Sequence, residues 1–252
     1  NCGGCAMKED ILYGINPVRE ALRGNRKAFE LFVQTGGTDQ RIAKLATLAE
    51  EKGIAVRRRE RADLERLAGN PHHQGVVLKV APFIYAELED FLANHQESEG
   101  GMFLLVLDRI QDPQNLGALI RSAACAGVQG VIIPKDRACG MTPVVEKASA
   151  GAVETIPVIQ VTNLVQTLER LKQAGCWIFG LAGEANKDIY QADYRGNLAL
   201  VVGSEGEGIR PLVRKHCDLL LAIPHYGGIS SLNASVAGGI VLFEAARQRC
   251  TP

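Results

Sequence analysis

The sequence lacks the features that mark several large classes of protein. No run of about 18 apolar residues occurs, and the apolar run Phe103–Leu107 is far too short to cross a bilayer, which predicts no membrane segment. The N-terminus has no basic-then-apolar signal pattern. Aromatic residues make up 5% of the chain and form no stacking platform of the RRM kind. We therefore expect a globular cytoplasmic protein.

Cysteines at metal-ligand spacing are also missing. Cys2 and Cys5 form a single CxxC within NCGGCA, which we interpret as an expression leader of residues 1–6 before Met7. No second CxxC or His pair follows at a suitable distance, so we expect no bound metal. The other cysteines are scattered, which is typical of a reducing compartment: Cys125, Cys139, Cys176, Cys217 and Cys250.

The charge is balanced over the chain and uneven along it. The formal net charge is +0, yet residues 8–80 hold fourteen Lys or Arg against ten Asp or Glu. In that part, residues 57–61 read RRRER, which could grip phosphates or be a solvated strand end. The excess weakly favours a polyanionic partner for the first part of the chain.

The first part of the chain predicts a small α/β domain at residues 7–81. Asn16 followed by Pro17 is a good helix start, and Gly53 is a helix terminator. The expected helices are 16–22, 39–52 and 62–67, and the expected strands are 29–34, 54–58 and 75–80. Residues 82–101 follow as a linker that includes a short helix at 87–94 and ends in the polar segment HQESEGG.

Residues 102–252 predict a second domain with a parallel sheet. Apolar strand-like runs alternate with helical stretches, as in sheets covered by helices on both faces. The runs are 103–107, 130–133, 157–161, 177–181, 198–202 and 219–222. The chain is thus expected to be α/β in both parts.

The first motif is DPQNLGALIRSA, which begins at Asp112. Asn115 lies near the start of a predicted helix and Arg121 lies nearly two turns further on. A helix that starts where a strand ends is a usual place for a site in open α/β sheets. The structural alternative makes Asn115 an N-cap and Arg121 a surface cation.

The second motif is the loop GSEGEG from Gly203 to Gly208, directly after the strand LALVV. Its glycines permit positive φ and close backbone approach, and it includes Glu205 and Gly206. A dinucleotide fingerprint has the order G-x-G-x-x-G after an early strand, whereas this loop is G-x-x-G-x-G near the chain's end. A purely structural glycine-rich turn is the alternative.

The third motif runs from Ile223 and Pro224 to the segment SLNAS. Ser231 or Asn233 could cap the helix predicted for residues 234–247, which by itself explains the polar residues. Leu232 between them is apolar and could line a ligand site.

Taken together, the three motifs resemble those of the SpoU or TrmH family of SPOUT methyltransferases, which methylate RNA ribose 2'-hydroxyls with S-adenosylmethionine. The resemblance covers nearly the whole chain and is nearest to the bacterial enzymes that act on a guanosine of 23S rRNA. It implies an L30e-like RNA-binding domain at the front, a deep trefoil knot in the second domain and a homodimer.

Site residues follow from the same resemblance. It implies catalytic roles for Asn115, Arg121, Glu205, Ser231 and Asn233, with Asn115 orienting the acceptor and Arg121 holding a phosphate. The implied S-adenosylmethionine site consists of Gly183, Gly203, Glu205, Gly206, Ile223, Pro224, Leu232 and Asn233. The alternatives are a tRNA ribose methyltransferase, a noncatalytic RNA-binding protein and a Rossmann oxidoreductase.

Overall fold

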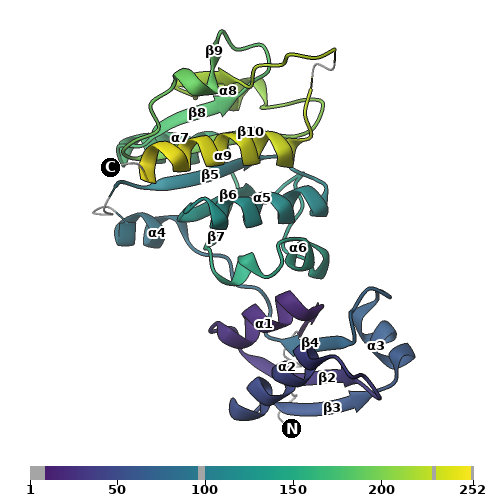
Figure 1. Ribbon diagram of the computed structural model, residues 1–252. Helices are drawn as coiled ribbons and strands as arrows, with labels where there is room; N and C mark the ends of the chain where they lie inside the picture. Colours follow the sequence, from purple (N-terminus) through teal and green to yellow (C-terminus); the bar gives the residue numbers. More distant parts are fainter. Residues whose placement is uncertain (1–8, 96–99, 229–230, 251–252) are drawn as a thin grey trace. The chain divides into compact units, whose positions relative to one another are not determined.

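The computed structural model describes residues 9–95, 100–228 and 231–250. By their contacts these residues form two compact units, which Figure 1 shows and which we describe separately. Unit 1 comprises the chain up to Ile84 together with Met141–Thr155, and unit 2 comprises Tyr85–Gly140 and the chain from Ile156 onward. The expected leader lies outside the described residues, as does most of HQESEGG. No described helix is long and apolar enough to cross a membrane.

Unit 1 is a four-stranded sheet with helices on both faces. The strand order is β1 (Asp10–Tyr13), β4 (Val76–Val80), β2 (Ala28–Gln34) and β3 (Ala55–Arg59), with only the β2–β3 pair parallel. Helices α1 (Ile15–Arg23) and α2 (Gln40–Glu51) enclose one core with Leu31 and Leu78. Helix α3 (Arg61–Ala68) packs Leu64 against Phe32 and Val77 on the opposite face. The predicted helices and strands are present, and β1 was not predicted.

The start of α1 differs from the sequence prediction. Its N-cap is Gly14, with φ 94°, and not Asn16. The amide of Ile15 donates to Oε1 of Gln74 over 2.9 Å, so a side chain distant in sequence satisfies the first turn. Asn16 therefore lies inside the helix, and Pro17 still fits because the first-turn amides have no partner within a helix.

A segment from the middle of the chain belongs to unit 1. Residues 141–155 form α6 (Pro143–Ala148) and the 3-10 turn η1 (Ala152–Glu154), and they cluster with the N-terminal residues. The predicted second domain therefore contains an inserted piece of the first unit. No sequence pattern indicated this, because α6 is short and only contacts across a long sequence separation assign it to unit 1.

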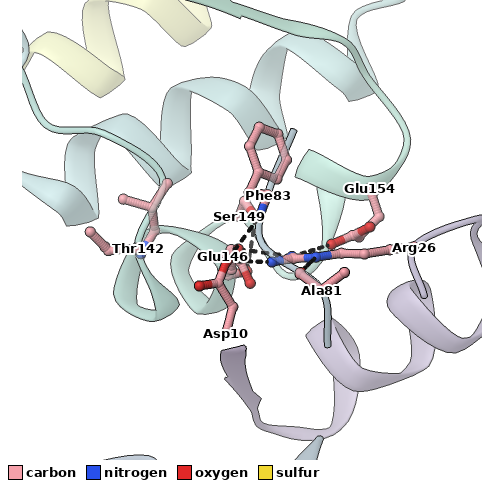
Figure 2. A network of polar contacts seen from close by, with 9 residues as sticks. Asp10, Arg26, Ala81, Phe83, Thr142, Glu146, Ser149 and Glu154 are labelled. Atoms are coloured by element: carbon pink, nitrogen blue, oxygen red, sulfur yellow. Dashed lines mark hydrogen bonds and ion pairs between the residues drawn. The ribbon is translucent and has the colours of Figure 1, made fainter. Parts of the chain in front are cut away.

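Arg26 holds this inserted segment through a buried polar network (Figure 2). Its Nη1 donates to Oε1 of Glu146 over 3.0 Å and to Oε1 of Glu154 over 2.9 Å. Nη2 reaches Asp10 at 2.8 Å, and Nε donates to the carbonyl oxygen of Ala81 at 2.8 Å. The Arg26 side chain is 7% exposed, and those of Glu146 and Glu154 are 4% and 7% exposed, so one guanidinium balances two carboxylates away from water.

Unit 2 is an all-parallel seven-stranded sheet. Its order is β7 (Val158–Val161), β6 (Gly130–Pro134), β5 (Phe103–Asp108), β10 (Leu198–Gly203), β8 (Trp177–Leu181), β11 (Leu219–Ala222) and β9 (Lys187–Asp188). The six predicted strands and the parallel sheet are confirmed. The two-residue edge strand β9 was not predicted.

Helices cover both faces of the sheet of unit 2. One face, with Leu104 and Val106, packs against α4 (Leu88–His95), α7 (Leu164–Gln173) and α8 (Pro211–Lys215). On the other face α5 (Pro113–Cys125) and α9 (Ala234–Cys250) lie side by side (Figure 1). The predicted linker thus contains a core helix, since Phe91 and Leu92 of α4 are 4% and 1% exposed. A cut at residue 102 would remove them.

The network around Arg26 makes a prediction for stability as a function of pH. Burial raises the pKa of Glu146 to about 7, although Arg26 acts to lower it. Because the folded pKa exceeds that of the unfolded chain, the contribution of Glu146 to stability is complete at low pH and is lost as the pH rises through about 7. Glu146→Gln cannot ionise, so its free energy of unfolding should rise relative to the wild type between pH 5 and pH 8.

Urea denaturation followed by circular dichroism across that range measures the effect. The control is Glu89→Gln, because hydrogen bonds from Arg170 lower the pKa of the exposed Glu89 and its charge is constant over the same range. The prediction would be contradicted if the free energies of unfolding of the wild type and Glu146→Gln changed equally with pH.

Candidate functional site

The candidate site lies where the direction of the sheet of unit 2 reverses. From β5 the chain continues outward through β6 and β7, and it then crosses to β8 on the far side of β10. Strands β5 and β10 are neighbours, with Asp108 opposite Gly203 at their carboxyl ends. Ligands of open α/β sheets bind at such a reversal. The first and second motifs follow these two strands.

Three polar side chains from distant segments meet at this edge. Nδ2 of Asn115 donates to Oε1 of Glu205 over 2.6 Å, and Nδ2 of Asn233 donates to Oδ1 of Asn115 over 3.0 Å. Asn233 also donates to the same oxygen of Glu205. We call this group the Asn–Glu–Asn triangle. It brings together three of the predicted catalytic residues.

Helix α5 positions Asn115 through its own cap. Asp112 is the N-cap, and its carboxylate accepts from the amides of Gln114 at 3.3 Å and Asn115 at 3.1 Å. Asn115 is consequently the third helical residue, and the N-cap role considered for it is wrong. Its side chain is free of capping, and the residue is 8% exposed.

Asn233 combines capping with a place in the triangle. Its Oδ1 accepts from the amides of Ser235 at 2.9 Å and Val236 at 3.3 Å at the start of α9. Its Nδ2 is directed to Asn115 and Glu205. Asn233 can therefore cap α9 and also belong to the site, because its side-chain oxygen accepts hydrogen bonds while its side-chain nitrogen donates them.

The loop after β10 requires glycine at position 203, whether or not a ligand binds there. A Cβ atom on Gly203 would lie 2.0 Å from the carbonyl carbon of Gly208, because the loop closes on itself with Gly208 donating to Ser204 over 2.9 Å. Gly206 and Gly208 have φ of 82° and 66°, which favours glycine at both positions. The loop needs these residues to return its chain and carry Glu205 to the triangle.

The predicted S-adenosylmethionine residues follow neighbouring strands. Gly183 comes after β8, Gly203 ends β10 and Ile223 follows β11, and these three parallel strands are adjacent. A Cβ on Gly183 would meet nothing within 4 Å, and Leu232 is 40% exposed. Open backbone and an uncovered apolar side chain fit a nucleoside ligand. Their contact with the cofactor stays a prediction.

Arg121 and Ser231 form no hydrogen bond with the triangle in the described part of the chain. Arg121 is six residues beyond Asn115 on α5, which is about 9 Å along the helix and about 120° around it. It is exposed, and no described residue forms an ion pair or hydrogen bond with it. Ser231 is exposed and makes no hydrogen bond to the triangle within the described residues.

A pocket of about 520 Å³ adjoins Asn115 and Glu205. Its lining includes Arg109 and Arg137, which the sequence analysis did not identify. Arg109 directly follows β5, and Arg137 comes three residues after β6. Their places at the ends of these buried strands could have marked them as candidate site residues. The described residues contain no group of three or more His, Cys, Asp or Glu side chains that could hold a metal.

Comparison with known families accounts for both units. A model described as the SpoU rRNA Methylase family matches residues 102–243, and one described as RNA 2'-O ribose methyltransferase substrate binding matches residues 11–86. The chain belongs to the SpoU methylase family. This assignment confirms the family inferred from the three motifs.

Individual relatives extend over almost the full length. The chain is 46% identical over 246 residues to the 23S rRNA (guanosine-2'-O-)-methyltransferase RlmB of Shewanella oneidensis, covering 96% of this chain and 98% of the relative. It is 43% identical to RlmB of Escherichia coli K12, covering 95% and 99%. An AdoMet-bound rRNA methyltransferase of Sinorhizobium meliloti superposes with a TM-score of 0.78 at 25% identity, covering 95% and 87%.

The close contact at Gly203 makes a prediction for stability. Gly203→Ala should lower the thermal unfolding midpoint and disrupt the loop, because the added Cβ would overlap the backbone of Gly208. Gly206→Ala is the matched control: the same atom there meets nothing within 4 Å, and only its φ of 82° is unfavourable. Gly206→Ala should cost about 1 kcal/mol. Equal losses in the two variants would argue against the overlap.

Proposed function

We propose that this chain transfers the methyl group of S-adenosylmethionine to the ribose 2'-hydroxyl of a guanosine in 23S rRNA. The Asn–Glu–Asn triangle at the carboxyl ends of β5 and β10 carries the proposal, because it places hydrogen-bonding groups beside a pocket. The substrate assignment is supported by the relatives, which are 23S rRNA (guanosine-2'-O-)-methyltransferases and whose similarity extends over both units.

The cofactor is held by backbone and apolar groups in this proposal. Gly183, Gly203, Gly206, Ile223, Pro224, Leu232 and Asn233 supply them from the loops after β8, β10 and β11. When bound, S-adenosylmethionine supplies an electrophilic methyl group. The carboxylate of Glu205 belongs to the loop after β10 and favours a cationic ligand. A deep trefoil knot formed by these loops stays a prediction.

The triangle orients the acceptor. Asn115 and Asn233 both donate to Oε1 of Glu205, which fixes the carboxylate and leaves its Oε2 without a hydrogen bond among the described residues. Oε2 is thereby available to accept from the ribose hydroxyl and polarise it. Ser231 completes the pocket as substrate binds. Methyl transfer proceeds in line, so correct placement of donor and acceptor supplies much of the rate enhancement.

Arg121 holds a phosphate of the target in this scheme. A guanidinium remains protonated in proteins and is a poor general base, whereas it binds phosphate well and stabilises developing negative charge. The exposure of Arg121 and its lack of a described partner suit this role. Unit 1 binds rRNA, as its match to the substrate-binding model supports.

We also propose a cytoplasmic homodimer that forms through α9. Val236 and Phe243 are 49% and 53% exposed, and at a spacing of seven residues they share one face of the helix. Val241 and Leu242 are fully buried and account for the intramolecular packing of α9. Sedimentation at micromolar concentration should give twice the chain mass, and a 27.1 kDa monomer would contradict the dimer.

Transfer of labelled methyl groups to purified RNA tests the function. Unmodified 23S rRNA and a tRNA pool are offered separately, and 2'-O-methylated positions are mapped by mass spectrometry after nuclease digestion. We expect a single methylated guanosine in 23S rRNA. Labelling confined to tRNA would instead indicate a tRNA ribose methyltransferase, and binding of RNA without methylation would indicate a noncatalytic protein.

Arg121→Ala should separate cofactor binding from turnover. Because Arg121 contacts substrate and not cofactor in the scheme, calorimetry should give wild-type affinity for S-adenosylmethionine. Single-turnover methylation should fall by roughly 100-fold, as for loss of one group that stabilises transition-state charge. Arg121→Lys keeps the charge without the planar fork and should also be impaired. Near-normal turnover in Arg121→Ala would remove this residue from the mechanism.

A further inference from the structure

Two arginines of unit 2 line two pockets at once. Arg109 and Arg137 belong to the walls of the pocket of about 520 Å³ that reaches Asn115 and Glu205. They also belong to the walls of a second pocket of about 350 Å³, together with Asn163. We call Arg109 and Arg137 the arginine pair. Since both residues are shared by both linings, the pair lies between the proposed reaction site and a further hollow of the surface.

Both arginines have an unfavourable backbone conformation. Arg109 has φ 61° and Arg137 has φ 54°, and these are two of only four non-glycine residues with positive φ in the described ranges. Such a conformation is unfavourable for a residue with a side chain and is often kept where function requires a particular side-chain position. Two of the four thus occur at one pocket wall.

The arginine pair has no anionic partner among the described residues. Nε of Arg109 is buried and makes no hydrogen bond, which is uncommon for a buried donor. Arg210 also lines the second pocket, but it is bound to Asp108 at 2.7 Å. The contrast shows that the pair, unlike its neighbour, retains its capacity for an anion.

None of the nearby carboxylates forms an ion pair with the arginine pair in the described part of the chain. Asp112 accepts from the amides that begin α5, and Glu205 accepts from the two asparagines of the triangle. Asp136 and Glu207 also line the pockets, and neither forms an ion pair with Arg109 or Arg137 in the described part of the chain.

We propose that Arg109 and Arg137 together bind one backbone phosphate of the RNA, next to the nucleotide whose ribose reaches Asn115. The inference rests on the proposed function and adds a substrate-positioning site to it. Guanidinium groups match phosphate oxygens in geometry and charge. The pair follows β5 and β6, whereas the proposed cofactor loops follow β8, β10 and β11, so the carboxylate of S-adenosylmethionine is the less suitable anion.

The test uses Arg109→Asn, Arg137→Asn and the double variant of the full chain. Asparagine tolerates positive φ better than arginine, so removing the guanidinium should not impair folding. The matched control is Arg195→Asn, an exposed cation that precedes β10 and thus lies at the opposite edge of the sheet. The probe is a fluorescent fragment of unmodified 23S rRNA that the wild-type protein binds, titrated by anisotropy at several salt concentrations.

Each pair variant should weaken RNA binding by about 10- to 100-fold, as expected for loss of a charge-assisted hydrogen bond. The slope of log affinity against log salt should fall by about 0.7, which corresponds to one phosphate of a single strand. The double variant should lose less than the product of the single losses, because both residues bind one phosphate. Arg195→Asn should bind as the wild type, and all variants should bind S-adenosylmethionine normally by calorimetry.

Three results would overturn the inference. The first is that RNA affinity and salt slope are unchanged in both single variants. The second is that the losses of RNA affinity in the two single variants multiply in the double variant. The third is a loss of S-adenosylmethionine affinity, which would assign the pair to the cofactor. Failure of the proposed function has a different signature, because wild-type protein would then methylate no guanosine of 23S rRNA. The binding comparison between variants remains valid in that case.

Discussion

The site depends on the closure of the loop after β10. Gly203 and Gly208 approach so closely that no side chain fits between them, and the turn returns the chain within a few residues. This closure carries Glu205 to the amides of Asn115 and Asn233, which come from the starts of α5 and α9. A carboxylate that accepts from two amides in this way holds three segments of the chain in one arrangement.

The parallel sheet gives the two sides of the site different chemistry. Loops on the β8 and β11 side carry open glycines and apolar residues, which suit a ligand bound through backbone groups. On the β5 and β6 side the pocket wall carries the arginine pair, which suits a polyanion. In the proposed scheme the cofactor lies on the β8 and β11 side of Glu205, and the RNA lies on the β5 and β6 side.

Unit 1 is held together by a different kind of interaction. Arg26 binds Asp10 of β1, whose side chain is 40% exposed, and two buried carboxylates of the inserted segment 141–155. Burying several charges around one guanidinium is costly, and removing the guanidinium would leave the carboxylates uncompensated. Unit 1 therefore needs the inserted segment to pair the buried guanidinium of Arg26. That segment lies far from the rest of the unit in the sequence.

Local pattern alone determined much of this protein. Apolar runs and glycine terminators gave the strands of the parallel sheet and most helices of unit 1, because burial and backbone conformation impose short-range periodicity. The site roles of Asn115, Glu205 and Asn233 were implied by the resemblance of the three motifs to the SpoU or TrmH family. Only the tertiary structure decided that these three side chains bond to one another. Tertiary structure likewise decided that Gly14 and Gln74 start α1, that α4 joins a core and that residues 141–155 join unit 1.

The arginine pair, too, was decided only by the tertiary structure. The positive φ of both residues and the buried, unpaired Nε of Arg109 result from the surrounding fold and leave no periodic pattern in the sequence.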